Sequence, residues 1–199
     1  MIINNVRIFL NTDAEESNFK ATATMLVNNQ FLLQSIRVFK AEGDKEFQVV
    51  YPIQRMNNGS LRHCMYPSNA KAKAKFDAAV LEAYQKVLSG ETDGNTVVFS
   101  EDTDRASYEI TRATIYPSKS SALQRAKIGL ELDGEIWLRG INMVVRENNS
   151  LFLNMPRRQM GEGKDLTYFH PIDQDARNVF TAAVIPFYEE ALPSWKQRR

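Results

Sequence analysis

The sequence contains few of the residues that build covalently linked or metal-stabilised folds. Its 199 residues include one cysteine, Cys64, and two histidines. A single cysteine excludes an internal disulfide framework and is typical of a reducing compartment, so we expect a cytoplasmic protein. Structural zinc sites take four Cys or His ligands at short spacings, and the chain has no such cluster. We therefore expect no metal site and no cofactor.

Long apolar runs are missing too. No segment approaches the roughly 18 consecutive apolar residues that span a bilayer. The opening stretch MIINNVRIFLNTD lacks the apolar core and cleavage site of a secretory leader. We therefore expect no membrane partner. The formal net charge is +1, which by itself does not indicate a nucleic-acid partner.

Catalytic signatures are also absent. Neither of the Gly-rich phosphate-binding patterns GxxxxGK[ST] and GxGxxG occurs. His63 and Cys64 are neighbours on an expected strand, where successive side chains point to opposite faces, so they cannot act as a pair. We predict no catalytic residues, and an enzyme is the least favoured class of function.

What the sequence does contain is an internal repeat. Residues 52–84 recur as residues 156–188, at a constant offset of 104 and without a gap. The matched positions include two prolines, a turn glycine and an apolar helix pattern: Pro52 and Pro156, Gly59 and Gly163, Pro67 and Pro171, Phe76 and Phe180, Tyr84 and Tyr188. We interpret the protein as an internal duplication.

The duplication divides the chain into four parts. They are a first repeat over 1–89, an acidic linker over 90–107, a second repeat over 108–192 and a basic tail over 193–199. The linker is recognised by its polar composition, because residues 89–107 hold five acidic residues and one basic residue.

Each repeat is expected to contain a long β-hairpin. Alternating apolar residues surround Asn28-Asn29 in the first copy and Asp133-Gly134 in the second, and both dipeptides favour the positive φ of two-residue turns. The alternation slips by one residue at Gln34-Ser35 and again at Arg139-Gly140. This slip predicts a β-bulge at the same place in both copies.

A helix is expected at the end of each repeat. Ser68 or Asn69 is a suitable N-cap for the first and Asp173 for the second, because apolar residues at helical spacing follow each. We expect Pro186 to kink or shorten the second helix and Pro193 to end it.

The whole pattern predicts an α+β fold made of two tandem β-β-β-β-β-α units with antiparallel sheets. A single unit of this size would leave the apolar face of its helix exposed. We therefore expect the two units to pack together as an intrachain pseudo-dimer.

The turn and helix of each repeat resemble the stage V sporulation protein G (SpoVG) septation-regulator family of bacteria. The second copy carries the resemblance most clearly, in its Met155-Pro156 pair, the basic residues that follow, Gly163, His170-Pro171 and the helix behind them. The resemblance implies an antiparallel sheet with a C-terminal helix that dimerises through its sheet. It also implies a DNA- or RNA-binding regulator linked to septation, sporulation and gene expression.

The resemblance further implies a nucleic-acid-binding site at the turn and at the helix start. Basic side chains there would neutralise phosphates. Carried over to this sequence, with neighbouring charges included, the site comprises Arg55, Arg62, Lys71, Lys73 and Lys75 in the first repeat and Arg157, Arg158 and Arg177 in the second. Gln54 and Gln159 replace basic residues, and Leu166 replaces the arginine kept as Arg62.

Two classes of function stay open. The leading hypothesis is a non-enzymatic nucleic-acid-binding regulator, with DNA and RNA undistinguished. The alternative is a protein-interaction or assembly module that kept the fold without binding nucleic acid, which the incomplete basic motifs favour. In either case we expect a monomeric pseudo-dimer of 22.7 kDa, with further dimerisation through sheet edges left open.

Overall fold

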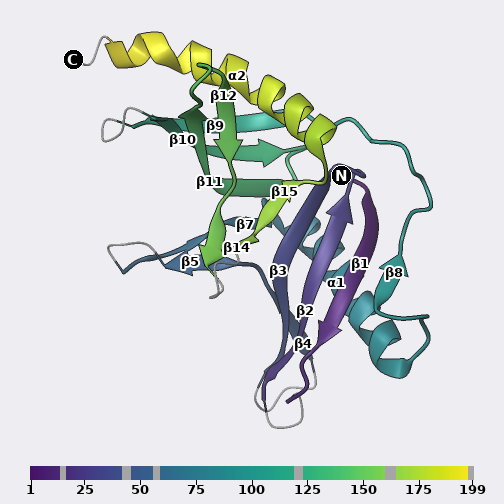
Figure 1. Ribbon diagram of the computed structural model, residues 1–199. Coiled ribbons are helices and arrows are strands. Elements are labelled where there is room, and N and C mark those ends of the chain that lie inside the picture. The colour runs from purple at the N-terminus through teal and green to yellow at the C-terminus, as the bar shows by residue number, and fades with distance from the viewer. Residues whose placement is uncertain (14–16, 42–45, 56–58, 119–122, 160–164, 197–199) are drawn as a thin grey trace.

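A computed structural model describes residues 1–13, 17–41, 46–55, 59–118, 123–159 and 165–196 (Figure 1). The expected turn residues Asn57 and Asn58, and the last three residues of the basic tail, lie outside these ranges. Within them the chain forms two larger antiparallel sheets, two short hairpins and two helices. The predicted α+β class, with two tandem units that each end in a helix, is confirmed.

The two units contain the same elements in the same order. The first comprises β1 (Ile3–Leu10), β2 (Phe19–Val27), β3 (Phe31–Lys40), β4 (Phe47–Val50), β5 (Ile53–Arg55), β6 (Leu61–His63), β7 (Met65–Pro67) and α1 (Ala70–Ser89). The short strand β8 (Thr96–Val98) lies between the units. The second comprises β9 (Ile110–Pro117), β10 (Gln124–Leu132), β11 (Ile136–Val145), β12 (Leu151–Asn154), β13 (Arg157–Gln159), β14 (Asp165–Thr167), β15 (Phe169–Pro171) and α2 (Gln174–Lys196).

Within the described ranges, each unit has seven strands rather than the five expected, because two expected strands are split in each unit. The fourth is divided into β4 and β5 in the first unit and into β12 and β13 in the second. The fifth expected strand is divided by Cys64 into β6 and β7 in the first unit, and by Tyr168 into β14 and β15 in the second. The break allows the two halves of the strand to pair with different partners. β6 pairs with β5, whereas β7 leaves its own unit.

The two units exchange these last strands. β7 of the first unit pairs with β11 of the second, and β15 of the second pairs with β3 of the first. Both exchanges are antiparallel and three residues long. The expected intrachain pseudo-dimer is therefore held together by backbone hydrogen bonds, and Figure 1 shows β15 lying beside β3 at the junction of the two sheets.

The predicted bulges belong to this exchange. In the first unit, the two residues Gln34-Ser35 lie opposite the single residue Thr24. In the second, Arg139-Gly140 lie opposite the single residue Gly129. Ser35 has φ +62° and Gly140 has φ +81°, so both take the left-handed conformation of a bulge. The bulges aim one backbone N–H out of each strand toward the other unit. Gln34 N donates to Tyr168 O at 2.8 Å, and Arg139 N donates to Cys64 O at 2.7 Å.

The predicted hairpin turns and helix caps are present. Asn28 and Asn29 have φ of +53° and +49°, and Asp133 and Gly134 have φ of +52° and +63°, as a two-residue turn requires. Asn69 caps α1 by accepting a hydrogen bond from Ala72 N at 2.9 Å. Asp173 accepts the matching bond from Ala176 N, also at 2.9 Å.

The expected end of the second helix is wrong. α2 continues through Pro186 and Pro193 to Lys196. A proline inside a helix removes one backbone hydrogen bond and crowds the preceding turn, but Val184 and Tyr188, two residues before and after Pro186, are buried in the core. α1 ends differently. Gly90 takes φ +74° and its N–H bonds back to Lys86 O and Val87 O, so the chain turns back toward β1.

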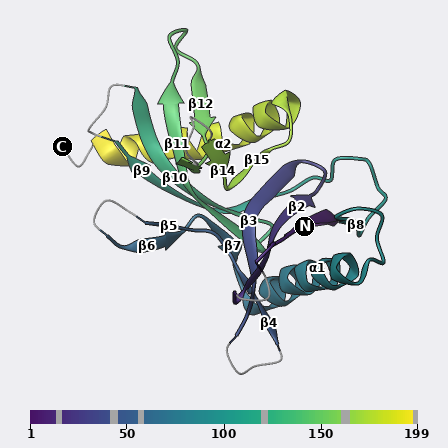
Figure 2. The ribbon, with the colours of Figure 1, turned by 60° about the horizontal axis from the view of Figure 1, so that its bottom comes forward.

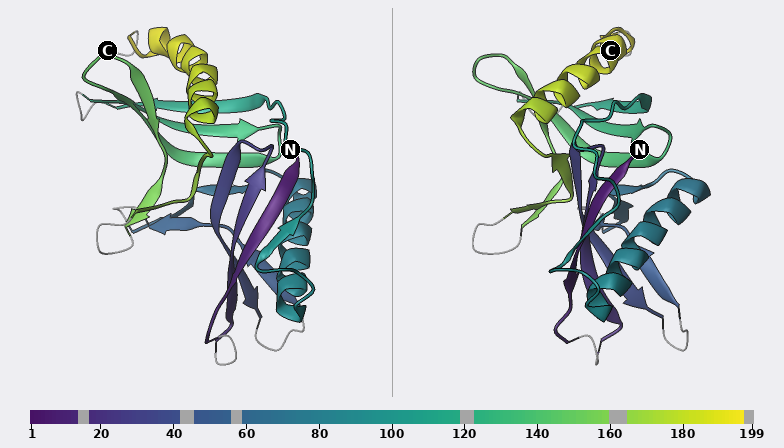
Figure 3. Two further views of the ribbon diagram at one scale, coloured as in Figure 1. Left: turned by 45° about the vertical axis from the view of Figure 1, so that its right-hand side comes forward. Right: turned by 90° about the vertical axis from the view of Figure 1, so that its right-hand side faces the viewer.

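The core runs through the contact between the units. Each helix covers one sheet, as Figures 2 and 3 show: α1 lies against the sheet that contains β1, and α2 against the sheet that contains β9. At the centre, Phe31 of the first unit packs edge-to-face on Phe180 of α2, with ring centroids 5.2 Å apart, and on Tyr108 at 5.1 Å. Phe31 and Phe180 are buried, so the core joins both units.

Candidate nucleic-acid interface

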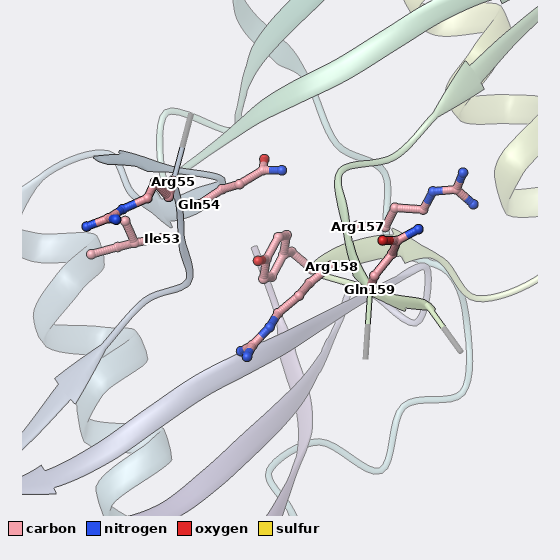
Figure 4. A pocket seen from close by; sticks show the side chains of 7 residues that line it. Ile53, Gln54, Arg55, Arg157, Arg158 and Gln159 are labelled. Atoms are coloured by element: carbon pink, nitrogen blue, oxygen red, sulfur yellow. The ribbon is translucent and has the colours of Figure 1, made fainter. Parts of the chain in front are cut away.

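The two short hairpins, β5–β6 and β13–β14, come from equivalent places in the two repeats and enclose a groove. Its volume is about 530 Å³. The lining residues are Ile53, Gln54, Arg55, Arg157, Arg158, Gln159 and Tyr168. The structure therefore brings Arg55 of the first copy together with Arg157 and Arg158 of the second, although about a hundred residues separate them in the sequence. We call this the inter-hairpin groove (Figure 4).

Equivalent residues of the two repeats face each other across the inter-hairpin groove. Figure 4 shows Gln54 and Arg158, which are 104 residues apart, extending into the space between the hairpins. Arg55 and Arg157 point away from it, toward opposite sides. The groove thus has one cation inside and one on each flank, and all three guanidinium-bearing residues are exposed.

The residues beneath the groove are buried and hold its polar lining. Cys64 Sγ donates to Gln54 Oε1 at 3.7 Å. Burial raises the pKa of the Cys64 thiol to about 11, although hydrogen bonding to Gln54 and the charge of Arg62 oppose the shift. The thiol is therefore protonated at neutral pH and serves as a hydrogen-bond donor rather than a nucleophile. Tyr168, at the equivalent position of the second repeat, is only 5% exposed.

A second groove of about 430 Å³ shares Gln54 and Arg157 with the first. Its other polar lining residues are Asn142, Asn154, Thr167 and Arg177. Arg177 is half-buried here: its guanidinium lies 5.4 Å from the centroid of the Phe152 ring and donates to Leu153 O at 3.4 Å. We call this the side groove. It presents amide groups next to cations, which suits contact with a nucleobase edge beside a phosphate.

The three predicted lysines of α1 lie outside the residues that line either groove. Lys73 forms an ion pair with Asp77 one turn along the helix, and Lys75 forms one with Glu135 at 2.7 Å. Lys71 is exposed on the same helix. The structure therefore does not bring these lysines together with the arginines of the turns. It uses Lys75 to join α1 to the β10–β11 turn of the other unit.

The remaining predicted arginines differ in their surroundings. Arg62 is exposed on β6 and lies opposite Gln54 in the hairpin register. Arg157 forms an ion pair with Asp165 at 2.6 Å, which offsets part of its charge. Within the described ranges, Arg55, Arg62 and Arg158 have no ion-pair partner within 4.0 Å.

Replacing Glu135 by glutamine should make stability less dependent on pH. Burial alone would raise the pKa of Glu135, but Lys75 and the N-terminal ammonium outweigh it and lower the pKa. A lowered carboxyl pKa contributes stability above the unfolded-state value and loses it as pH falls through the folded-state value. Glu135→Gln should therefore cost up to about 1 kcal/mol at pH 7.

Urea denaturation at a series of pH values measures the Glu135 effect. The difference from the unchanged chain should vanish below about pH 3, where carboxyls are protonated in both states. Glu82→Gln is the matched control, because Glu82 pairs with Lys86 with its side chain 51% exposed and should contribute less. An equal loss at pH 7 and pH 3 would show that the glutamate acts through packing, not charge.

Two further features bear on other classes of site. Among the described residues, no group of three or more His, Cys, Asp or Glu side chains is placed to hold a metal ion. No helix in the same part of the chain is long and apolar enough to cross a membrane.

Sequence reasoning missed the uncharged half of the site. Tyr168, Asn142 and Asn154 belong to no basic motif, and only the fold brings them beside the arginines. The ion pair of Lys73, by contrast, was visible in the sequence, because Asp77 follows four residues later on the same helix face.

Comparison with known proteins gives consistent matches over both repeats. The family model described as SpoVG matches residues 1–86 and 108–190. A protein of Archaeoglobus fulgidus is 34% identical over 82 residues, which are 41% of this chain and 95% of that protein. A protein of Clostridium beijerinckii is 31% identical over 91 residues, 46% of this chain and 96% of its own length. Both are provisionally named septation protein SpoVG. Each relative thus has about the size of one of the two units.

Proposed function

The chain belongs to the SpoVG family, and from this premise we propose that it is a nucleic-acid-binding regulatory protein whose inter-hairpin groove contacts the backbone of DNA or RNA. One observation carries the proposal. Arg55 of the first repeat and Arg157 and Arg158 of the second line one open groove. Guanidinium groups pair with phosphates through two parallel hydrogen bonds, so a converging set of them suits a phosphate backbone.

The roles of the individual residues follow from their positions. Arg158 reaches into the groove and would bind a phosphate there, with Gln54 donating from the opposite hairpin. Arg55, and Arg62 on the neighbouring strand, would contact phosphates along one flank. Arg157 would contact the other flank with less net charge, because Asp165 is bonded to it.

The other predicted contacts take lesser roles in the proposal. Arg177 lines the side groove, where it would position a nucleobase against Asn142 and Asn154. Lys71 remains a peripheral phosphate contact. Lys73 and Lys75 are assigned to structure, because each is already paired with a carboxylate.

A salt titration of binding tests the proposal. Fluorescence anisotropy with labelled single- and double-stranded DNA and RNA should show binding that weakens as salt rises, because counterions are released from each neutralised phosphate. Three to four arginine contacts should give a logarithmic slope of about −3 on duplex DNA. No binding to any of the four probes at low salt would contradict the proposed function.

A protein-interaction role is the second candidate, and an exposed apolar pair favours it. Ile53 and Leu61 face solvent on the β5–β6 hairpin, with 40% and 66% of their surfaces exposed. Exposed apolar residues beside a groove are common where another protein docks. If no nucleic acid binds, a pull-down comparing the unchanged chain with Leu61→Asp would test this surface. Because the relatives are named for septation, it is the first process in which to compare the unchanged chain with Leu61→Asp.

A further inference from the structure

The two units differ at one edge of their sheets. In the first unit, β8 pairs with the outer edge of β1, so β1 is an inner strand. In the second unit, β9 is the last strand of its sheet, and no described strand pairs with its outer edge. Figure 1 shows β8 as the short strand beside β1. Among the described residues, the second unit therefore has no counterpart of β8.

The chain supplies β8 to the first unit in antiparallel register. Val97 pairs with Val6 and Thr96 with Arg7. Backbone bonds flank the pairing: Ile8 N donates to Asn95 O, and Phe99 N donates to Asn4 O, both at 2.8 Å. Val97 is 5% exposed and joins the core. An extended Thr-Val-Val segment therefore completes this edge.

The outer edge of β9 has the same geometry as that of β1. A register shift falls at the same place in both strands, at Asn4 in β1 and at Thr111 in β9. After it, Val6 lies opposite Met25, and Ala113 lies opposite Leu130, the counterpart of Met25. Ala113 is therefore the counterpart of Val6. Ser118 N bonds to Arg125 O on the inner side, so alternation turns the backbone groups of Ala113 and Ile115 outward.

Within the described residues, the chain after α2 does not return to this edge as the chain after α1 returns to β1. After α1, the left-handed turn at Gly90 sends the chain back to pair with β1. The counterpart of Gly90 is Ser194, and α2 continues through it to Lys196.

We propose that a second copy of this chain completes the edge, with two β9 strands pairing antiparallel around a two-fold axis at Thr114. In this register Ala113 of one copy pairs with Ile115 of the other, and the two Thr114 residues face each other. The incoming Thr114-Ile115-Tyr116 then takes the places that Thr96-Val97-Val98 occupy on β1. The two segments read TVVFS and TIYPS, so each begins with threonine and has a serine two residues after the paired stretch.

The side chains of β9 are complementary to themselves in this register. Arg112 of one copy lies opposite Tyr116 of the other, and both side chains are largely exposed. An arginine over a tyrosine ring is attractive, and opposed threonines can share a hydrogen bond. Pro117 has no N–H, so the bond that Phe99 makes to Asn4 has no counterpart. The short pairing predicts a weak dimer, governed by concentration and independent of nucleic-acid binding.

Sedimentation equilibrium over a concentration series tests the proposal. The unchanged chain should rise from 22.7 kDa toward twice that mass. Thr114→Lys places two like charges on the axis and should keep the chain monomeric at the highest concentration. Thr114→Glu should do the same. A mixture of the two variants should recover the doubled mass, because opposite charges then meet on the axis, and a folding defect could not be rescued in this way.

Val98→Lys is the matched control, since it places a lysine on β8, the edge strand of the first sheet beside β1, where 60% of Val98 is exposed. This variant should dimerise like the unchanged chain. A dimer that survives Thr114→Lys, or is lost in Val98→Lys alone, would overturn the assignment of β9. So would a chain that stays monomeric throughout. If that monomer binds a labelled peptide of residues 94–101, the edge accepts a foreign strand instead of a second copy.

Discussion

Reversing the charges of Arg55 and Arg158 together should remove most nucleic-acid binding. One residue comes from each hairpin, both are exposed, and neither has an ion-pair partner among the described residues, so the change removes two phosphate contacts and adds two repulsive charges. We expect a loss of affinity of about 100-fold or more at physiological salt, and a salt slope reduced by about 2. Anisotropy titrations of the double variant Arg55→Glu/Arg158→Glu measure both quantities.

A second double variant controls for the change in net charge. Lys86→Glu/Lys127→Glu alters the total charge equally, but Lys86 lies on α1 and Lys127 on β10, and neither lines a groove or belongs to the proposed site. It should lose much less affinity. Equal losses in the two variants would show that binding follows net charge, and the inter-hairpin groove would no longer be the site. Unchanged binding in the arginine variant would lead to the same conclusion.

Replacing Phe31 by alanine should cost about 3–5 kcal/mol of folding free energy. Phe31 is 1% exposed and packs against Phe180 and Tyr108, so the substitution leaves a cavity where the two units meet. Because the exchanged strands tie both sheets into one core, the whole chain should still unfold in a single transition at a lower denaturant concentration. Urea denaturation followed by fluorescence and by circular dichroism measures this.

Phe9→Ala gives the reference for this substitution. Phe9 lies on β1 with 49% of its surface exposed, and surface changes of this kind usually alter stability by less than about 0.5 kcal/mol. Two separate transitions, of which only one shifts in Phe31→Ala, would show that the units fold independently. That result would contradict a shared core even if the total loss of stability were as large as expected.

Local features of the fold could be predicted because local chemistry determines them. Asn28-Asn29 and Asp133-Gly134 tolerate positive φ, and both form the expected turns. The slip in alternation at Gln34-Ser35 could be recognised as a bulge because a one-residue slip otherwise turns every later side chain to the wrong face. The end of α2 could not be predicted in the same way, because burial of its apolar face outweighs the proline at position 193.

The exchange of strands could not be predicted from these patterns. β7 and β15 are three residues long, and such a segment carries no periodicity that says which sheet it joins. Their partners are fixed by bonds between residues far apart in sequence, such as that from Ser68 N to Glu135 O. The resemblance to a family that dimerises through its sheet indicated that the units would meet, but not which strands would cross.

The candidate site was predictable in part for the same reason. Arg55 and Arg158 occupy the basic turn positions, and the groove between them exists because the hairpins of both units come together. Lys73 was grouped with them by the resemblance, and Lys75 as a neighbouring charge. In the structure their charges are matched by Asp77 and Glu135. Glu135 belongs to the other repeat, so its pairing with Lys75 could not be predicted from neighbours in the sequence.

The exchange of β7 and β15 also governs the order in which the chain can fold as it leaves the ribosome. When α1 has been synthesised, β7 has no partner, because residues 136–138 of β11 do not yet exist. The sheet of the first unit likewise lacks β15 until residue 171 has emerged. The first repeat must therefore wait, unfinished, for almost the entire second repeat to be translated. A nascent chain released between the repeats would expose the unpaired β7 and a first sheet that lacks β15. The first repeat can therefore complete its fold only when the second repeat is also made.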